Sequence, residues 1–291
     1  MKKIPSDVVK DYSNWNGQGV ALWWLGQAGF LIRAGGLNIL IDPYISDTLA
    51  AKYRGTELPH IRMMPPPIKG RDLTRIDFYI CSHAHSDHMD PELIPVVMEN
   101  NPACLFLCPK AIKSIAQERG APAERIIGLR ANISYRLGNM MELIPIPAAH
   151  ENLEIDEHGR HKYLGYIIKI GAITLFHPGD CCPYTGLDDH LTNYSIDIAM
   201  MPVNGRQLAL KEQGIPGNYS LEEAWELCER HDITYMLAHH FGMFEFNTVN
   251  PELLKRKICS GDRQDRFFPV EVGICYNLQR RSNDARNTPQ R

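Results

Sequence analysis

The sequence has no long apolar run and no excess of charge of one sign. None of its hydrophobic stretches approaches the roughly 20 residues of a membrane-spanning helix, and the N-terminal segment MKKIPSDVVK lacks the apolar core of a signal peptide. The 31 basic and 34 acidic residues give a formal charge of −3, and no basic stripe recurs at helical spacing. These absences predict a cytoplasmic protein that has neither a membrane nor a nucleic acid as its partner.

Cysteine is used sparingly, with eight residues in a chain of 291. Cys104 and Cys108 lie inside the apolar run ACLFLCP, which indicates reduced core thiols rather than disulfides. A zinc site on this pair is the alternative, but no second pair at finger spacing completes it.

Linkers and short repeats are also missing. No stretch rich in glycine and serine divides the chain. We therefore expect one domain over residues 1–278, built from two similar halves at about 20–150 and 160–275. A polar tail is expected at 279–291. The sequence does not determine whether the chain forms a homo-oligomer.

Apolar runs and turn residues indicate both strands and helices. Residues 20–42 are typical of an antiparallel meander, because glycines separate short apolar runs. Residues 48–70 are rich in proline and are expected to be an irregular loop, which often borders a site. Further strands are expected at 76–81, 103–107, 140–147, 163–170, 172–176, 197–202, 233–238 and 270–275. Helices are expected at 91–100, 110–119 and 221–230, the last with Ser220 as its N-cap.

The run His83-Ala84-His85-Ser86-Asp87-His88 directly follows the strand expected at 76–81. In extended chain alternate side chains point the same way, so His83 and His85 can converge on one ion. A turn after Ser86 would direct Asp87 and His88 to a second ion. Neutral imidazole and carboxylate suit zinc and related divalent ions, whereas the alternative of a solvated polar loop does not explain this density of them.

Other candidate ligands also follow expected strands, namely His150, Asp180 and the pair His239 and His240. A single histidine after a strand is more often a capping or packing residue. A cleft at the edge of a sheet, however, would assemble ligands from distant strand ends. Gly179 lets the backbone approach closely, so the carboxylate of Asp180 could bridge two cations.

These residues resemble the signature of the metallo-β-lactamase superfamily, which is a His-x-His-x-Asp-His run, a later histidine, a Gly-Asp pair and a final histidine after a strand. The resemblance spans residues 20 to about 275. It implies an α/β (α+β) fold, a four-layer αββα sandwich with two divalent metal ions at one edge. The resemblance assigns His83, His85 and His150 to the first ion, Asp87, His88 and the last histidine to the second, and Asp180 to both.

The segments LWWLGQAGFLI, LIDPYISD, IDFYICSHAHSDH and HPGDCCPY are similar to those of one branch of the superfamily. This branch contains ascorbate 6-phosphate lactonase and the phospholipase D that acts on N-acyl phosphatidylethanolamines. It favours His240 over His239 as the last ligand, because a short stretch ending in an aromatic residue follows. It also implies that Asp42 fixes the tautomer of a ligand histidine, with a turn-forming aspartate before Pro43 as the alternative.

Two divalent ions would lower the pKa of a water between them to near neutrality and so supply a hydroxide nucleophile. Asp87 and Asp180 form the catalytic pair, with Asp87 as ligand and proton acceptor. We therefore expect a metal-dependent hydrolase with a small-molecule substrate, in particular a lactonase acting on a small anionic cyclic ester such as an L-ascorbate 6-phosphate-like lactone. A phosphodiesterase, an iron redox protein and a non-catalytic scaffold are the alternatives. Zinc is favoured, and manganese and iron accept the same ligands.

Substrate contacts are expected from Arg206, Tyr184 and His239, because arginine pairs with phosphate or carboxylate through two hydrogen bonds. Weaker candidates lie on the long loop, namely Arg54, Arg62 and Lys69. Cys181 and Cys182 lack the context of a nucleophile. His177 is expected in the core. The histidines of polar segments are expected at the surface; they are His60, His158, His161, His190 and His231.

Overall fold

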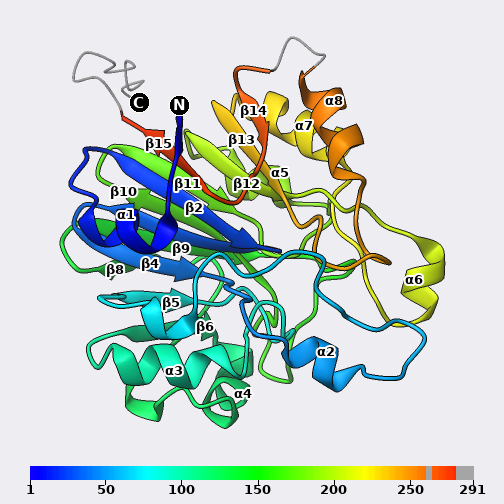
Figure 1. The fold of residues 1–291 in the computed structure, drawn as a ribbon, viewed down its shortest axis with the longest axis horizontal. Helices are drawn as coiled ribbons and strands as arrows, with labels where there is room; N and C mark the ends of the chain where they lie inside the picture. Colours follow the sequence, from blue (N-terminus) through cyan, green and yellow to red (C-terminus); the bar gives the residue numbers. More distant parts are fainter. Residues whose placement is uncertain (260–263, 280–291) are drawn as a thin grey trace.

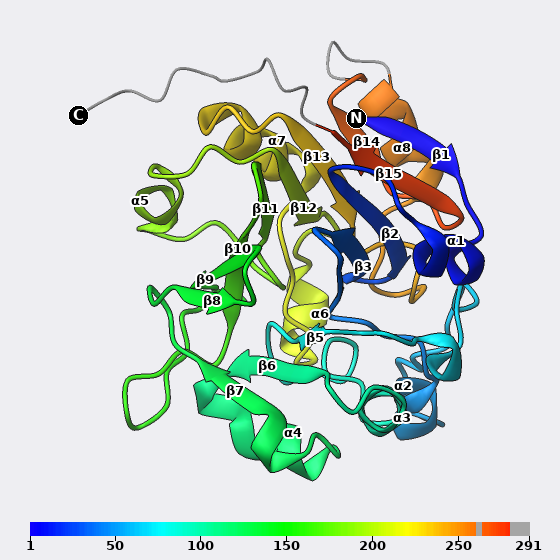
Figure 2. The same ribbon diagram turned by 90° about the vertical axis from the view of Figure 1, so that its left-hand side faces the viewer.

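The computed structural model describes residues 1–259 and 264–279, which form two β-sheets packed face to face with helices on their outer faces (Figures 1 and 2). This arrangement confirms the predicted αββα class. Of the polar tail expected at 279–291, residues 280–291 lie outside the described part.

The first sheet has eight strands within the described residues, in the order β1-β15-β2-β3-β4-β5-β6-β7. Pairing is antiparallel from β1 to β4 and parallel from β4 to β7. The strands are β1 (Lys2–Pro5), β2 (Val20–Gly26), β3 (Gly29–Ala34), β4 (Leu37–Ile41), β5 (Phe78–Ile80), β6 (Leu105–Pro109), β7 (Ile126–Leu129) and β15 (Ile274–Leu278).

The second sheet has seven strands within the same residues, in the order β14-β13-β12-β11-β10-β9-β8. Strands β11 to β14 are parallel, and β8 to β11 are antiparallel. The strands are β8 (Tyr135–Leu137), β9 (Met141–Pro147), β10 (Leu164–Ile170), β11 (Ile173–His177), β12 (Ile198–Pro202), β13 (Tyr235–His239) and β14 (Phe267–Pro269).

Helices cover both outer faces. On the side of the first sheet lie α1 (Val8–Asn14), α3 (Leu93–Asn100) and α4 (Lys113–Glu118), whose apolar residues share a cluster with that sheet. On the side of the second sheet lie α5 (Leu187–Leu191), α7 (Leu221–Arg230) and α8 (Pro251–Cys259). Two short helices, α2 (Thr48–Lys52) and α6 (Leu208–Glu212), project from one edge of the sandwich (Figure 1). Among the described residues, no helix is long and apolar enough to cross a membrane.

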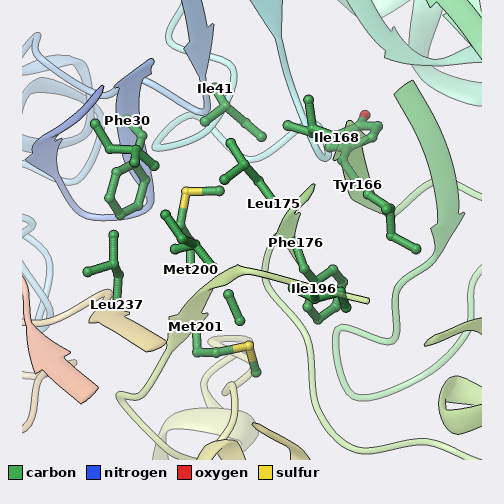
Figure 3. Packing of buried hydrophobic residues seen from close by; sticks show 14 of the residues in the cluster. Phe30, Ile41, Tyr166, Ile168, Leu175, Phe176, Ile196, Met200, Met201 and Leu237 are labelled. Carbon is green, nitrogen blue, oxygen red and sulfur yellow. The ribbon is translucent and has the colours of Figure 1, made fainter. Parts of the chain in front are cut away.

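The core follows from the two-residue period of the strands. In β2, Leu22 and Trp24 face the second sheet, whereas Trp23 and Leu25 face the helices of the first sheet. Both faces of this strand are therefore buried, which explains its unbroken apolar sequence. Between the sheets, side chains such as Phe30, Met200 and Leu237 interdigitate (Figure 3).

Most expected elements are confirmed, with boundary shifts. Helix α7 begins and ends as expected, with a complete capping box from Ser220. The strand expected at 270–275 is displaced, because residues 270–273 connect β14 to β15 and β15 begins only at Ile274. The halves expected at 20–150 and 160–275 do not coincide with the sheets, because β8 and β9 belong to the second sheet and β15 to the first. All eight cysteines lie in the described part and are free, as expected.

Candidate metal centre

The candidate ligands lie at one edge of the sandwich, where strands of both sheets end. In the first sheet, the His83–His88 run follows β5, and Asp42 follows the neighbouring parallel strand β4. In the second sheet, Asp180 follows β11 and His240 follows β13. Carboxyl ends of parallel strands meet at one edge of a sheet, which is why residues so far apart in sequence converge here.

Three groups of side chains bring ligand atoms within 4.8 Å of one another. The first is His83, His85 and His150, and the second is Asp87, His88 and His240. A third joins His83 and His88 through Asp180. The structure thus brings together all seven predicted ligands, grouped as the resemblance implied, with Asp180 between the two sets.

Unsatisfied buried atoms point toward a common centre. The Oδ1 atom of Asp180 lies 3.2 Å from Nε2 of His88 and 3.2 Å from Nε2 of His240. Among the described residues, Nε2 of His83, Nε2 of His88 and Oδ1 of Asp180 are buried without a hydrogen bond of good geometry. A divalent cation would satisfy such convergent lone pairs together. The residues therefore fit a metal centre.

The hydrogen bonds of Asp42 orient the first-sheet ligands. Its Oδ2 accepts from Nδ1 of His88 at 2.8 Å, which leaves Nε2 of that ring facing Asp180. The same carboxylate accepts from the backbone nitrogen of Ser82 at 2.7 Å and from its hydroxyl at 2.5 Å. Asp42 therefore has the orienting position that the resemblance implied.

Gly179 allows the second sheet to approach the first. It has a φ of +67°, and a Cβ atom there would lie 2.7 Å from Cβ of Ser82. Only glycine accommodates both the left-handed backbone and this contact. The predicted close approach before Asp180 is confirmed.

Burial and neighbouring charges together set the charge states of the cluster. Burial lowers the pKa of His150 to about 4, so its ring is neutral at pH 7. Burial alone would raise the pKa of Asp180, but His240 and His88 bring it well below its ordinary value. Burial would lower the pKa of His88, yet Asp180, Asp42 and Asp87 raise it well above its usual range. Without a cation, His88 therefore holds a proton among three carboxylates.

A cavity of about 160 Å³ opens onto the cluster. It is small beside the 300 to 1,000 Å³ of sites for drug-sized ligands. Residues outside the ligand set that line it include Lys52, Tyr53, His60, Arg119, Ile215, Pro216 and Phe244. Lys52 and Arg119 are not among the predicted substrate contacts. His60 was expected at the surface, whereas its ring stacks on Tyr53 at 4.1 Å between ring centres.

The expected substrate contacts need correction. His239 is completely buried, stacked on His177, and does not line this cavity. The hydroxyl of Tyr184 donates to the carbonyl of Pro147 at 2.6 Å, and Tyr184 lines a different cavity. Arg206 pairs with Glu223 and also lines a separate cavity.

The weaker candidates also lie elsewhere. Arg54 and Arg62 line a cavity formed by residues of the long loop and α2, and Lys69 lines another beside α3. The physical reason is that side-chain direction within an irregular loop depends on its tertiary packing, which residue type does not reveal. His177 is buried in the core, as expected.

Comparison with known proteins shows the family to which the chain belongs. The model of the beta-lactamase superfamily domain matches residues 37–241. The chain belongs to the metallo-β-lactamase superfamily. A metal-dependent hydrolase of Caldivirga maquilingensis is 27% identical over 63% of this chain and 70% of its own length. N-acyl-phosphatidylethanolamine-hydrolyzing phospholipase D 1 of Caenorhabditis elegans is 26% identical over 56% of this chain and 47% of its own.

Among solved structures, the isothiocyanate hydrolase from Delia radicum gut bacteria has a TM-score of 0.73 at 14% identity and covers 89% of this chain and all of its own. That similarity shows the fold alone. Membership of the metallo-β-lactamase superfamily accounts for the sandwich and for ligands at its edge. It leaves open the metal and the bond that is cleaved.

Proposed function

We propose that this member of the superfamily is a metal-dependent lactonase that opens a small anionic cyclic ester, such as a sugar-phosphate lactone. The observation that carries the proposal is the pairing of the ligand cluster with two cationic side chains in one small cavity. Lys52 is exposed at the end of α2, and Arg119 lies half-buried at the end of α4. These two cations balance Asp87 and Asp180, so two bound divalent ions would leave the cavity strongly positive.

His83, His85 and His150 would hold one ion, Asp87, His88 and His240 the other, and Asp180 both. Two divalent ions there would make a water nucleophilic at neutral pH and polarise the ester carbonyl. In this mechanism Asp87 would accept the water's proton. Water oxygen bonds to the carbonyl carbon, the ring C–O bond breaks, and the same proton can pass from Asp87 to the leaving alkoxide. The products are a hydroxy acid and an unchanged enzyme.

Lys52 and Arg119 would hold the anionic group of the substrate away from the reacting carbonyl. The guanidinium of Arg119 already donates to the carbonyl of Met89 at 2.7 Å, which fixes it at the cavity wall. The Lys52 ammonium lies 4.9 Å from the centre of the Tyr53 ring. Because one cation is fixed and the other is on an exposed helix end, we expect Arg119 to orient the anion and Lys52 to increase its capture rate.

The test measures kcat/KM of metal-replete protein for a neutral sugar lactone and for the same lactone carrying a phosphate. We expect a preference for the phosphorylated lactone that falls about three- to fivefold in Lys52→Ala. Arg54→Ala is the matched control, because it removes one charge two residues away on the wall of a different cavity. No turnover of either lactone would refute the lactonase, and equal rates for both would refute the anionic substrate.

A phosphodiesterase is the second candidate, supported by the similarity to the phospholipase D. The same two-ion chemistry would act on a phosphorus centre. A chromogenic phosphodiester measured beside the lactones separates the two. Turnover of the phosphodiester without lactone opening would favour the second candidate. For the metal we propose two divalent ions, with zinc first, and elemental analysis after expression without supplementation would distinguish zinc from manganese and iron.

A further inference from the structure

Gln27 lies at the metal centre although it belongs to none of the ligand motifs. It occupies the turn between β2 and β3, where its exposed fraction is 1%. Its φ of +50° is in the left-handed region that non-glycine residues rarely adopt. Such a conformation persists only where surrounding contacts hold it, and it is frequent at functional sites.

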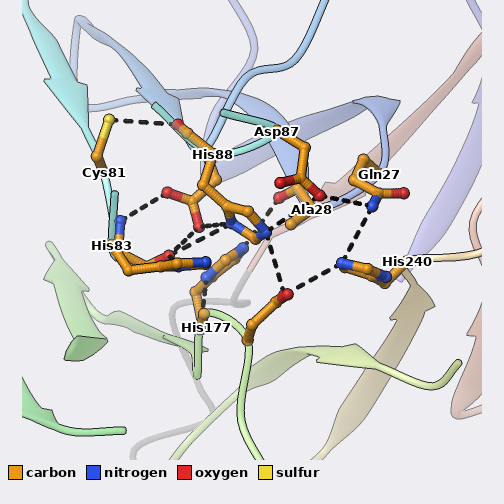
Figure 4. A network of polar contacts seen from close by, with 12 residues as sticks. Gln27, Ala28, Cys81, His83, Asp87, His88, His177 and His240 are labelled. Carbon is orange, nitrogen blue, oxygen red and sulfur yellow. Dashed lines mark hydrogen bonds and ion pairs between the residues drawn. The ribbon is translucent and has the colours of Figure 1, made fainter. Parts of the chain in front are cut away.

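The side chain of Gln27 joins two ligands that come from different sheets. Its Nε2 donates to Oδ2 of Asp87 at 2.8 Å and lies 3.2 Å from Nε2 of His240 (Figure 4). Because a carboxylate can only accept, the amide nitrogen must be the atom that faces Asp87. The contact therefore determines which oxygen of Asp87 is engaged and leaves Oδ1 for another partner.

The backbone of the same turn contacts two segments of the second sheet, one that contains His240 and one that leads from His177 to Asp180. The carbonyl of Gln27 accepts from the backbone nitrogen of His240 at 3.0 Å. The next carbonyl, of Ala28, lies 3.0 Å from Nε2 of His177, whose Nδ1 accepts from the nitrogen of Gly179 at 3.1 Å. One turn of the first sheet thus connects to the segments of Asp87, His240 and Asp180.

We propose that Gln27 is a positioning residue for the second metal ion, acting through Asp87 and His240. This role depends on the ligand cluster and not on the identity of the substrate, so it stands or falls separately from the lactonase activity. Its amide fixes the rotamer of Asp87, and its carbonyl fixes the backbone from which His240 projects. Among the described residues, the hydrogen bonds of the Gln27 side chain reach Asp87 and His240 and not His83, His85 or His150, so its influence falls on one of the two sites.

The decisive variant is Gln27→Gly, because glycine adopts a φ of +50° freely and keeps the carbonyl that accepts from His240. Gln27→Asn is the second variant, since asparagine tolerates this backbone but its amide is one carbon too short to reach Asp87. Asn132→Gly is the matched control, because Asn132 also has a left-handed backbone, with a φ of +63°, and does not line the cavity of the ligand cluster. Circular dichroism and thermal melting of the metal-free proteins show that each variant is folded.

Each protein is loaded with zinc, dialysed against graded chelator and analysed for zinc per chain. We expect wild type and Asn132→Gly to retain two ions over the same chelator range. We expect both Gln27 variants to keep the first ion at wild-type affinity and to bind the second about 10- to 100-fold more weakly, as is typical when an orienting partner of a ligand is lost. Retention of both ions at wild-type affinity would overturn the proposal, and so would equal weakening of both sites, since that indicates a general structural role.

Discussion

Nδ1 of His88 donates a hydrogen bond of 2.8 Å to Oδ2 of Asp42, and both side chains are fully buried. The acceptor is a carboxylate, so the proton must sit on Nδ1 and the other ring nitrogen is the one available to a metal. Asp42 has a φ of +45°, another left-handed residue beside the site. A strained backbone is maintained where the side chain makes three hydrogen bonds.

Asp42→Asn should lower metal affinity about 10- to 100-fold. The amide supplies one acceptor oxygen where the carboxylate supplied two, and its NH₂ group opposes the His88 proton. The measurement is a competition titration with a chromogenic chelator. Asp197→Asn is the control, because Asp197 is also buried and accepts a backbone hydrogen bond, from Thr174 at 2.8 Å, before β12 begins. Unchanged affinity in Asp42→Asn would show that Asp42 only shapes the turn before Pro43.

Metal affinity should rise with pH around neutrality. The raised pKa of His88 means that the metal-free protein holds a proton that a cation must displace. Because the pKa of His88 is higher in the folded protein than its ordinary value of about 6.5, protonated His88 stabilises the metal-free fold fully at pH values below 6.5. This stabilisation is lost as the pH rises through the pKa of His88 in the folded protein. The increase in melting temperature on adding zinc should therefore be larger at pH 8 than at pH 6. An increment that is equal at both values would contradict this assignment of the proton.

Residue type and local spacing were enough to predict that the His83–His88 run supplies metal ligands, because these ligands are neighbours on a short stretch of chain. The strands that precede Asp180 and His240 could also be predicted, since their apolar runs end at polar residues. Convergence of these ends needs only the rule that parallel strands present their carboxyl ends at one edge. The residues of the candidate metal centre could therefore be predicted from the sequence.

The residues that line the cavity could not be predicted in the same way. Lys52 belongs to the short helix α2, inside a segment that was expected to be irregular. Arg119 lies at the end of α4, which packs on the first sheet. Gln27 lies within the segment LWWLGQAGFLI, but its residue type does not single it out, because a glutamine in a glycine-containing turn is ordinary at the surface. The direction of each of these side chains depends on how the sheets and loops pack, which a single sequence does not specify.

Asp180→Asn should weaken both metal sites, in contrast to the one-site effect expected of Gln27→Gly. Asp180 lies between the two ligand groups, with Oδ1 near His88 and His240 and Oδ2 3.7 Å from Nε2 of His150. Loss of its charge removes the anion that both ions would share. We expect zinc per chain to fall below one at a chelator concentration where wild type keeps two, with at least a hundredfold loss of kcat. If the variant binds two ions as tightly as wild type, Asp180 is not a shared ligand.

The adjacent residues His239 and His240 offer a test within a single strand end. The ring of His239 packs edge-on to Phe30 at 5.4 Å and stacks on His177 at 5.4 Å, whereas His240 turns toward Asp180 because its φ is +64°. His240→Gln should weaken the second metal ion at least tenfold with little change in the melting of the metal-free protein. His239→Gln should leave zinc per chain at two and instead lower stability by about 0.5–1.5 kcal/mol through lost ring packing. Zinc analysis and thermal melting of both variants give the answer, since a loss of zinc in His239→Gln alone would assign the last ligand to the other histidine.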